Sequence, residues 1–216
     1  RVLVTGASGF IGAPVVRRLA SAGYDVHAIS RRGRAADVGV PGRADATWHS
    51  ADLLGGADGE RLMTALHPTH LVHLAWHTTH AEYWSAPENL RWLEASLRLV
   101  RVFAANGGHR AVLAGSCAEY HAEGGVCVED QTPAIPSTLY GACKHALNIA
   151  VSSFGASVGV STAWARIFNL YGPREQPARV LPSVIQHLLK PEPAPCSDGL
   201  QLRDYLHVDA AAGALV

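Results

Sequence analysis

The stretch that decides the fold is VLVTGASGFIGAPVVRRLA, residues 2–20. Its first four residues are apolar or β-branched, as in a buried parallel strand. From residue 10 to about residue 22, apolar residues recur at helical spacing. Gly6, Gly9 and Gly12 stand between these two segments. The stretch therefore predicts a strand, a tight turn and an amphipathic helix, in that order.

A glycine turn between a strand and a helix is suited to binding the pyrophosphate of a dinucleotide. Backbone amides at the helix N-terminus attract the anion, and the absence of side chains lets it approach. The three glycines are spaced three and three, whereas the common fingerprint G-x-G-x-x-G spaces them two and three. A simple tight connection remains the alternative interpretation. The strand before the turn and the helix after it favour cofactor binding.

Elements of these two kinds alternate up to about residue 171. Strands are expected at RVLV, YDVHAIS, HLVHLAW, RAVLAGS and VSTAWARIFNL. Residues 10–22, 87–105 and 139–154 have the length and apolar spacing of helices. Strands separated by helix-length crossovers form parallel sheets with helices on both faces. We therefore predict an α/β protein with a Rossmann-like, doubly wound parallel sheet.

The sequence changes in character after Tyr171. GPREQPARVLP and KPEPAPCSDG are rich in proline and glycine, with one short apolar segment, residues 184–189, between them. We expect a dinucleotide-binding domain over residues 1–171 and a smaller substrate-binding lobe over residues 172–216. Residues 203–216 are expected to pack back on the main domain. Because AAAGALV resembles the opening of a helix, the lobe is expected to be truncated.

Composition excludes several classes of protein. The 216 residues are 48% hydrophobic and have a formal net charge of zero, so no overall field favours nucleic acid or an acidic membrane surface. No apolar run reaches the roughly 18 residues of a membrane span. The four cysteines show no CxxC pairing, and His77 and His80 have no carboxylate or cysteine at ligand spacing, so we expect no metal site. These features predict a cytoplasmic protein.

The segment LYGACKHAL places Tyr140 and Lys144 four residues apart, on one face of the predicted helix. A free tyrosine has a pKa near ~10, which is too high for efficient proton transfer at neutral pH. An ammonium group about 5 Å away would favour the phenolate by roughly 3 kcal/mol, or about two pKa units. We therefore expect Lys144 to lower the pKa of Tyr140 and make it an acid or base. An exposed helical pair is the alternative.

The turn TGASGFIG resembles the nucleotide-binding turn of the extended short-chain dehydrogenase/reductase family, whose members act largely on nucleotide-activated sugars. ADL, residues 51–53, resembles the family segment whose aspartate contacts the adenine, although a solvated loop carboxylate is an alternative for Asp52. HLAW, residues 73–76, resembles a strand end that lines the cofactor cleft. The cofactor-binding residues that the resemblance implies are Gly6, Gly9, Phe10, Ile11, Gly12, Asp52, Leu53, Leu74, Ala75, Tyr140 and Lys144.

The segment AGSCAEYH, residues 114–121, resembles the family's catalytic serine or threonine segment. The resemblance implies that Ser116, Tyr140 and Lys144 are catalytic, with the serine hydrogen-bonding the reacting oxygen and the tyrosine as acid or base. Two positions depart from the family pattern. His121 replaces a glycine, and Cys117 and Ala118 stand where sugar 4,6-dehydratases carry an Asp-Glu pair. Dehydration is therefore disfavoured.

Two further segments resemble the substrate side of this family. ARIFNLYGPRE implies that Asn169 contacts the diphosphate of a nucleotide sugar, and DGLQLRDYLHVDAA implies that Arg203 pairs with that diphosphate. A guanidinium suits this role because it can contact two phosphate oxygens at once. In this family the helix corresponding to residues 87–105 pairs across a dimer interface, so the resemblance also implies a homodimer. The apolar residues of this helix at helical spacing are Trp92, Leu93, Leu97 and Val100, a pattern that ordinarily indicates a core face.

The segment ISRRGR, residues 29–34, bears on the choice of cofactor. It follows the second predicted strand, where the adenosine ribose lies in this fold. Ser30, Arg31 and Arg32 offer a hydroxyl and two positive charges, with no acidic residue before Asp37. An arginine accommodates the 2′-phosphate of NADP, so NADP is preferred and NAD remains possible.

These features together predict an NADPH-dependent 4-ketoreductase of a nucleoside-diphosphate sugar. A nucleotide-sugar 4-epimerase with bound NAD is the alternative, because the same three catalytic residues serve both reactions. A binding protein that keeps the dinucleotide fold without catalysis is a third hypothesis. The presence of Ser116, Tyr140 and Lys144 argues against it.

Overall fold

The computed structural model describes residues 1–216 except 32–45, 80, 122–124 and 191. Its main sheet contains six parallel strands in the order β3-β2-β1-β4-β5-β6. The strands are β1 (Val2–Thr5), β2 (Val26–Ser30), β3 (Ala46–Ser50), β4 (His70–His73), β5 (Arg110–Ser116) and β6 (Ser161–Ile167). This topology confirms the predicted Rossmann-like, doubly wound sheet. The strand order reverses between β1 and β4, and ligands of such sheets bind at the carboxyl ends of the strands beside this reversal.

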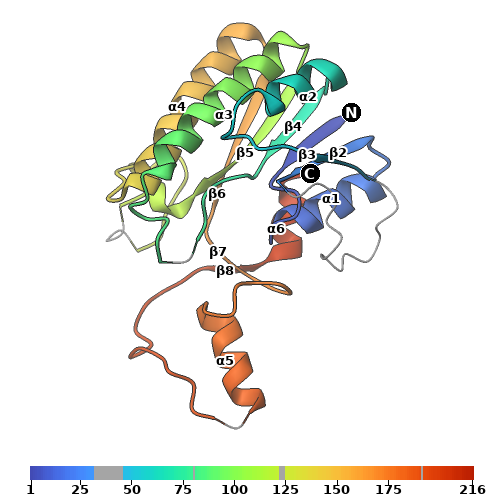
Figure 1. The fold of residues 1–216 in the computed structure, drawn as a ribbon. Coiled ribbons are helices and arrows are strands. Elements are labelled where there is room, and N and C mark those ends of the chain that lie inside the picture. The colour runs from blue at the N-terminus through green and yellow to red at the C-terminus, as the bar shows by residue number, and fades with distance from the viewer. Residues whose placement is uncertain (32–45, 80, 122–124, 191) are drawn as a thin grey trace.

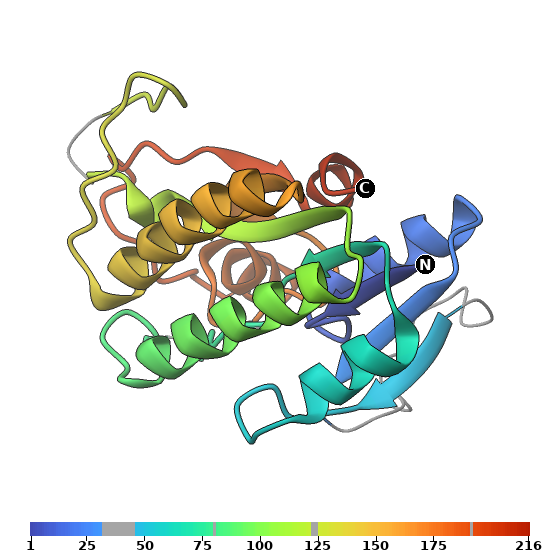
Figure 2. The same ribbon diagram turned by 90° about the horizontal axis from the view of Figure 1, so that it is seen from above.

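Helices cover the two faces of the sheet (Figures 1 and 2). One face is covered by α2 (Asp58–Leu66), α3 (Glu88–Ala105) and α4 (Leu139–Val158), and the other by α1 (Gly12–Ser21) and α6 (Val208–Ala214). Side chains alternate along β1, so Leu3 packs beneath the first group of helices while Val2 and Val4 pack beneath the second. The core is therefore divided into two layers by the sheet.

A second, smaller lobe follows β6 (Figure 1). It contains α5 (Val180–Leu189), in which no residue is buried, and a two-stranded parallel sheet of β7 (Asn169–Tyr171) and β8 (Tyr205–His207). The chain then returns to the main domain through α6, which packs against α1. An ion pair of 2.9 Å joins Arg17 to Asp209. Residues after 207 therefore belong to the packing of the main domain.

The described part of the chain contains no helix that is both long and apolar enough to span a membrane.

Candidate active site

The glycine turn between β1 and α1 is too crowded for side chains. Gly6 has φ +65, and a Cβ atom there would lie 2.8 Å from the amide nitrogen of Ala75. A Cβ atom on Gly12 would lie 2.1 Å from the carbonyl oxygen of Gly6. At the start of α1, no side chain caps the helix and the first turn has no acidic residue. The Gly9 amide donates to the Gly6 carbonyl, but the uncapped N-terminus of α1 remains attractive to an anion, which fits a dinucleotide pyrophosphate.

The carboxyl ends of β1 and β4 are joined beside this turn. The hydroxyl oxygen of Thr5 accepts hydrogen bonds of 3.2 Å from the amides of Leu74 and Ala75. This contact holds the backbone of Ala75 against Gly6. Phe10 and Ile11 follow in the same turn and are half-buried. These predicted cofactor residues therefore surround one site at the strand reversal.

The predicted ribose and adenine residues lie at the ends of β2 and β3. Ser30 is buried, and the exposed Arg31 follows it, with its carbonyl accepting a hydrogen bond from the Ser50 hydroxyl. Arg32 lies outside the described residues. After β3, the exposed Asp52 accepts a hydrogen bond of 3.0 Å from the Leu54 amide. The half-buried Leu53 packs against the core beside α3.

The three predicted catalytic residues converge at the carboxyl end of β5. Ser116 is the last residue of β5, and Tyr140 and Lys144 occupy the first turns of α4. The Ser116 side chain lies near enough to Tyr140 to oppose the rise in pKa that burial causes there. Lys144 Nζ donates a hydrogen bond of 2.8 Å to the carbonyl of Ala114, two residues before Ser116. A serine, a tyrosine and a buried lysine therefore gather at the carboxyl end of β5.

Tyr140 stands in an aromatic enclosure. The ring centroids of Tyr83, Trp84 and Trp76 lie 4.9, 5.9 and 6.4 Å from that of Tyr140, all edge-on. The amide of Tyr140 also donates to the carbonyl of Trp84 at 3.1 Å. Sequence reasoning missed Tyr83 and Trp84, because they reach α4 from a loop more than fifty positions away.

The expectation that Lys144 lowers the pKa of Tyr140 is wrong for this structure. Burial raises the pKa of Tyr140 to about 12, while the nearby Ser116 side chain opposes the rise. Lys144 is itself buried, which lowers its pKa to about 7. Its Nζ lies 3.8 Å from the centre of the Trp76 ring and bonds to the Ala114 carbonyl. Desolvation of both groups therefore outweighs the attraction that the helical spacing predicted.

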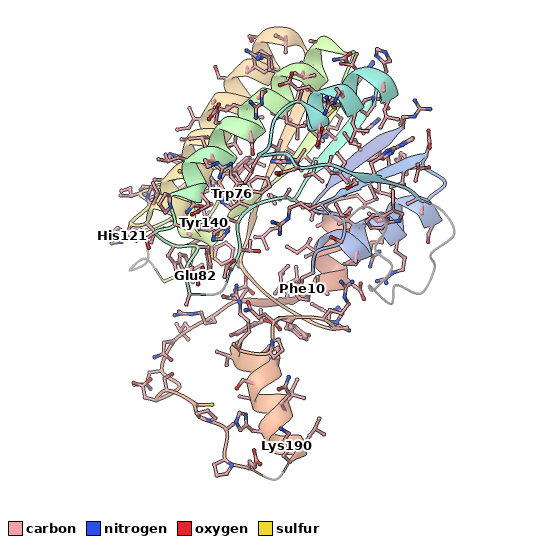
Figure 3. The ribbon with its side chains drawn as sticks, viewed as in Figure 1. Phe10, Trp76, Glu82, His121, Tyr140 and Lys190 are labelled. Carbon is pink, nitrogen blue, oxygen red and sulfur yellow. The ribbon has the colours of Figure 1, made fainter. Side chains whose placement is uncertain are left out.

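Trp76 is fixed where it can hold Lys144. Its indole Nε1 donates a hydrogen bond of 2.8 Å to Oδ1 of the fully buried Asn89. Asn89 in turn donates to the carbonyls of Tyr83 and Ala86. In Figure 3, Trp76 and Tyr140 lie on the α3 and α4 side of the main domain, and Phe10 lies on the α1 side.

The predicted substrate residues lie where the second lobe begins and returns. The amide groups of Asn169 donate to the carbonyl of Asp204, so this side chain joins β7 to the segment before β8. Arg203 is exposed, and its positive charge opposes the rise in pKa that burial causes at Cys117, next to Ser116. The positive charge of Arg179 likewise opposes the rise in pKa that burial causes at Tyr83. Two arginines of the second lobe therefore bring positive charge near Cys117 and Tyr83, beside the predicted catalytic residues.

One further contact connects the second lobe with the glycine turn. Arg174 Nη2 donates a hydrogen bond of 3.1 Å to the carbonyl of Ser8.

Among the described residues, no group of three histidine, cysteine or acidic side chains is placed to hold a metal ion. His80, the partner of His77 in the WHTTH segment, lies outside the described residues.

A family model described as the NAD dependent epimerase/dehydratase family matches residues 2–216. The chain belongs to this family. The match confirms the resemblance to extended short-chain dehydrogenases/reductases that the sequence motifs indicated. All of the predicted catalytic and cofactor-binding positions fall within the matched residues.

Individual relatives of this family member share its fold at low identity. It is similar to a UDP-glucose 4-epimerase of Corynebacterium glutamicum, with 27% identity over 96% of this chain and 67% of that protein. A UDP-N-acetylglucosamine 4-epimerase of Methanobrevibacter ruminantium M1, solved with UDP-N-acetylmuramic acid, superposes with a TM-score of 0.87 and 27% identity. That comparison covers 100% of this chain and 71% of the other.

A second structure carries both a nucleotide sugar and a cofactor. MoeE5 in complex with UDP-glucuronic acid and NAD has a TM-score of 0.82 and 30% identity, covering 99% of this chain and 70% of that one. The chain thus spans about two thirds of the length of the relatives it matches.

Proposed function

We propose that this chain transfers hydride between a nicotinamide dinucleotide and C4 of a nucleoside-diphosphate sugar, as an NADPH-dependent 4-ketoreductase. The observation that carries the proposal is the convergence of Ser116 and Tyr140 at the end of β5, which is separated from β1 and its glycine turn by β4 alone. When bound, the reduced nicotinamide supplies the hydride. Everything else in the reaction falls to residues of this chain.

Tyr140 is suited to protonate the product oxygen. Its raised pKa, about 12, means that the phenol keeps its proton at neutral pH. Reduction of a ketone consumes that proton, because the new alkoxide must be neutralised. An oxidation would instead require the tyrosine to lose its proton first. The state of Tyr140 therefore favours the reductive direction.

Ser116 and Lys144 support this proton transfer. Ser116 ends β5 beside Tyr140, and we expect its hydroxyl to donate to the same substrate oxygen. Lys144 brings a positive charge behind the tyrosine once it is protonated, which stabilises the phenolate left after the transfer. Arg203 and Asn169 are proposed to hold the substrate diphosphate, because a guanidinium and an amide suit phosphate oxygens.

The proposed preference for NADPH is supported by Arg31 and Ser30 at the end of β2. Neither residue would repel a 2′-phosphate, whereas an acidic side chain at this corner would select NAD. Arg32, the other arginine predicted to contact the 2′-phosphate, lies outside the described residues. NAD remains the second cofactor candidate, because MoeE5 was solved with NAD.

The second candidate function is 4-epimerisation with retained NAD. It is favoured by the relatives, since the curated and solved proteins described above include two nucleotide-sugar 4-epimerases. Dehydration finds less support, because Cys117 and Ala118 stand where the dehydratases of this family carry an acidic pair.

The deciding experiment supplies the protein with NADPH and a thymidine-diphospho-4-keto-6-deoxy sugar and follows the absorbance of the reduced cofactor. Oxidation of NADPH with formation of the 4-hydroxy sugar is expected. Interconversion of 4-epimers without added cofactor would instead establish the epimerase. Binding of the dinucleotide with neither activity would favour the non-catalytic alternative.

A variant pair checks the role of Tyr140. Tyr140→Phe removes the proton donor and keeps the ring, so turnover should fall by about a hundredfold or more while dinucleotide binding persists. Tyr24→Phe is the matched control, since Tyr24 is 42% exposed and lies outside the site. Turnover by Tyr140→Phe at the wild-type rate would exclude Tyr140 as the acid.

A further inference from the structure

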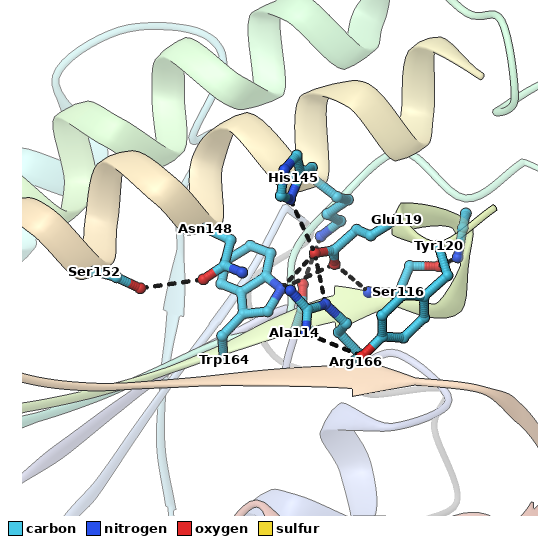
Figure 4. A network of polar contacts seen from close by, with 11 residues as sticks. Ala114, Ser116, Glu119, Tyr120, His145, Asn148, Ser152, Trp164 and Arg166 are labelled. Atoms are coloured by element: carbon cyan, nitrogen blue, oxygen red, sulfur yellow. Dashed lines mark hydrogen bonds and ion pairs between the residues drawn. The ribbon is translucent and has the colours of Figure 1, made fainter. Parts of the chain in front are cut away.

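A fully buried carboxylate lies directly behind Ser116. Glu119 ends the short helix η1 (Cys117–Glu119) after β5, and its exposed fraction is 0%. Its Oε1 accepts the amide of Ser116 at 2.8 Å, and both oxygens accept the indole Nε1 of Trp164 at 2.9 and 3.0 Å. Its Oε2 accepts Nε of Arg166 at 3.1 Å. Figure 4 shows these contacts converging from β5 and β6.

The surrounding structure is shaped to admit this carboxylate. A Cβ atom on Gly115 would lie 2.7 Å from Glu119 Oε1 and 2.2 Å from Trp164 Nε1, so only glycine leaves room. Arg166 is oriented by a second hydrogen bond, from Nη1 to the Tyr120 hydroxyl at 3.1 Å, and by stacking on that ring. A buried charge is costly unless it is paired in this way, and such a pair gives no stability advantage over apolar packing. Its presence beside catalytic residues therefore calls for a functional reason.

The charge of Glu119 acts on both members of the Tyr140 and Lys144 pair. Burial lowers the pKa of Lys144, and the negative charge of Glu119 opposes that fall. The same charge adds to the rise in pKa that burial causes at Tyr140. The other groups that face these residues are Tyr83 and Cys117 beside Tyr140, His73 beside Lys144, and His145 Nδ1, 4.0 Å from Glu119 Oε2.

We propose that Glu119 is a positioning residue of the active site, whose carboxylate holds the backbone of Ser116 and whose charge favours the ammonium form of Lys144. The assignment rests on the proposed function. Glu119 does not touch the substrate, because both oxygens are buried and used by Ser116, Trp164 and Arg166. It therefore differs in role from the acidic pair of the dehydratases, which would occupy the two positions immediately after Ser116.

The protonation state of Lys144 can be measured without any reaction. The chain contains two lysines, Lys144 and Lys190, so a protein labelled at the lysine ε-carbon gives two side-chain signals in an NMR titration. Lys190→Arg assigns them, and Lys190 lies at the far end of α5 (Figure 3). In Glu119→Gln the pKa of Lys144 should fall below its wild-type value. Glu129→Gln, at an exposed loop position, should leave it unchanged.

An opposing variant separates charge from loosened packing. Arg166→Met removes the positive partner, so the pKa of Lys144 should rise. Entry of water into a loosened site would raise this pKa in both variants, because hydration favours the ammonium form. An unchanged or raised pKa in folded Glu119→Gln would overturn the proposal. If Glu119→Gln does not fold, an unchanged or lowered pKa in Arg166→Met would overturn it.

Kinetics then test the consequence for catalysis. With a substrate that the wild type turns over, Glu119→Gln should lose about tenfold or more in kcat at pH 8 while KM stays within about threefold. The alkaline limb of its pH profile should move to lower pH, and Glu119→Asp, which keeps the charge, should recover part of the rate. An unshifted profile would overturn the proposal. Failure of the wild type with every sugar would count against the proposed function alone, because the NMR titration does not depend on turnover.

Discussion

The hydroxyl of Thr5 lies 2.7 Å from Nδ1 of His73, and both side chains are buried beneath the glycine turn. Because Thr5 Oγ1 already accepts the amides of Leu74 and Ala75, its own proton is directed to Nδ1. The ring proton must then be on Nε2, which donates to the Ser96 hydroxyl at 2.8 Å. This network fixes His73 as one neutral tautomer.

The first prediction concerns stability in acid. Burial lowers the pKa of His73 to about 3, from an ordinary value near 6.5. The unfolded chain therefore binds more protons between these values, so stability is fully present above about pH 6.5 and is lost as pH falls toward 3. The loss from this residue is at most about 5 kcal/mol.

Urea unfolding at a series of pH values checks this expectation in wild type and His73→Gln. The variant is expected to be less stable at pH 7 and to have a shallower slope between pH 6.5 and 3. Carboxylates titrate in the same range in both proteins, so the difference between the two slopes isolates His73. Equal slopes would contradict the prediction.

The second prediction uses two glycines with opposite surroundings. Gly12→Ala places a Cβ atom 2.1 Å from the Gly6 carbonyl, which forces the turn to open. We expect loss of dinucleotide binding, measured by calorimetry, and a melting temperature several degrees lower. Gly213→Ala, within α6, is the matched control. Its Cβ atom would meet only the Arg18 guanidinium, at 3.4 Å. It should bind normally and gain up to about 1 kcal/mol from helix propensity.

The third prediction concerns cofactor release. The hydrogen bond from Arg174 to the Ser8 carbonyl restrains the glycine turn from the second lobe. Arg174→Ala removes that restraint. We expect alanine at position 174 to keep the backbone conformation of the arginine, which has φ 73. Loss of one charge-assisted hydrogen bond, about 1.5 kcal/mol, should speed dinucleotide dissociation about tenfold in stopped-flow fluorescence. Unchanged dissociation would show that the contact does not retain the cofactor.

The fourth prediction concerns assembly. Leu90 and Leu97 are 56% and 38% exposed and lie two turns apart on one face of α3, and Ile149 is 58% exposed on the neighbouring α4. We propose that these side chains form the interface of a homodimer. Sedimentation should give a dimer for wild type and a monomer for Leu97→Glu. Arg91→Glu, at an exposed position of α3, serves as the charge control. A wild-type monomer at high concentration would refute the interface.

Elements with a strong local period were predictable from the sequence. Residues 110–116 form β5 as expected, and the helix expected over residues 87–105 begins one residue later, at Glu88. The helix expected to end at residue 154 continues to Val158, because its stop signal is Gly159 in the left-handed conformation, φ 75. The strand β3 and the helix α2 were missed, since ATWHS mixes polar and apolar residues and α2 buries only Gly59 and Met63.

Which residues lie together at the candidate site could be predicted from the sequence, whereas their electrostatics could not. Tyr140 and Lys144 are identified by local spacing, but their pKa values depend on rings and a carboxylate supplied from elsewhere. Glu119 meets Arg166 across 47 positions of sequence, and this pairing has no local signal. Desolvation is a property of the assembled structure. An estimate from the attraction between Tyr140 and Lys144 alone therefore gives the wrong sign for the change in the pKa of Tyr140.

The close approach of Gly115 to Glu119 and Trp164 also constrains how this sequence can vary. A larger residue at position 115 would collide with the carboxylate and the indole, so it can be accepted only if positions 119 and 164 shrink together. Positions 115, 119 and 164 should therefore covary among related chains, and a library randomised at all three should return the present set or a jointly altered one.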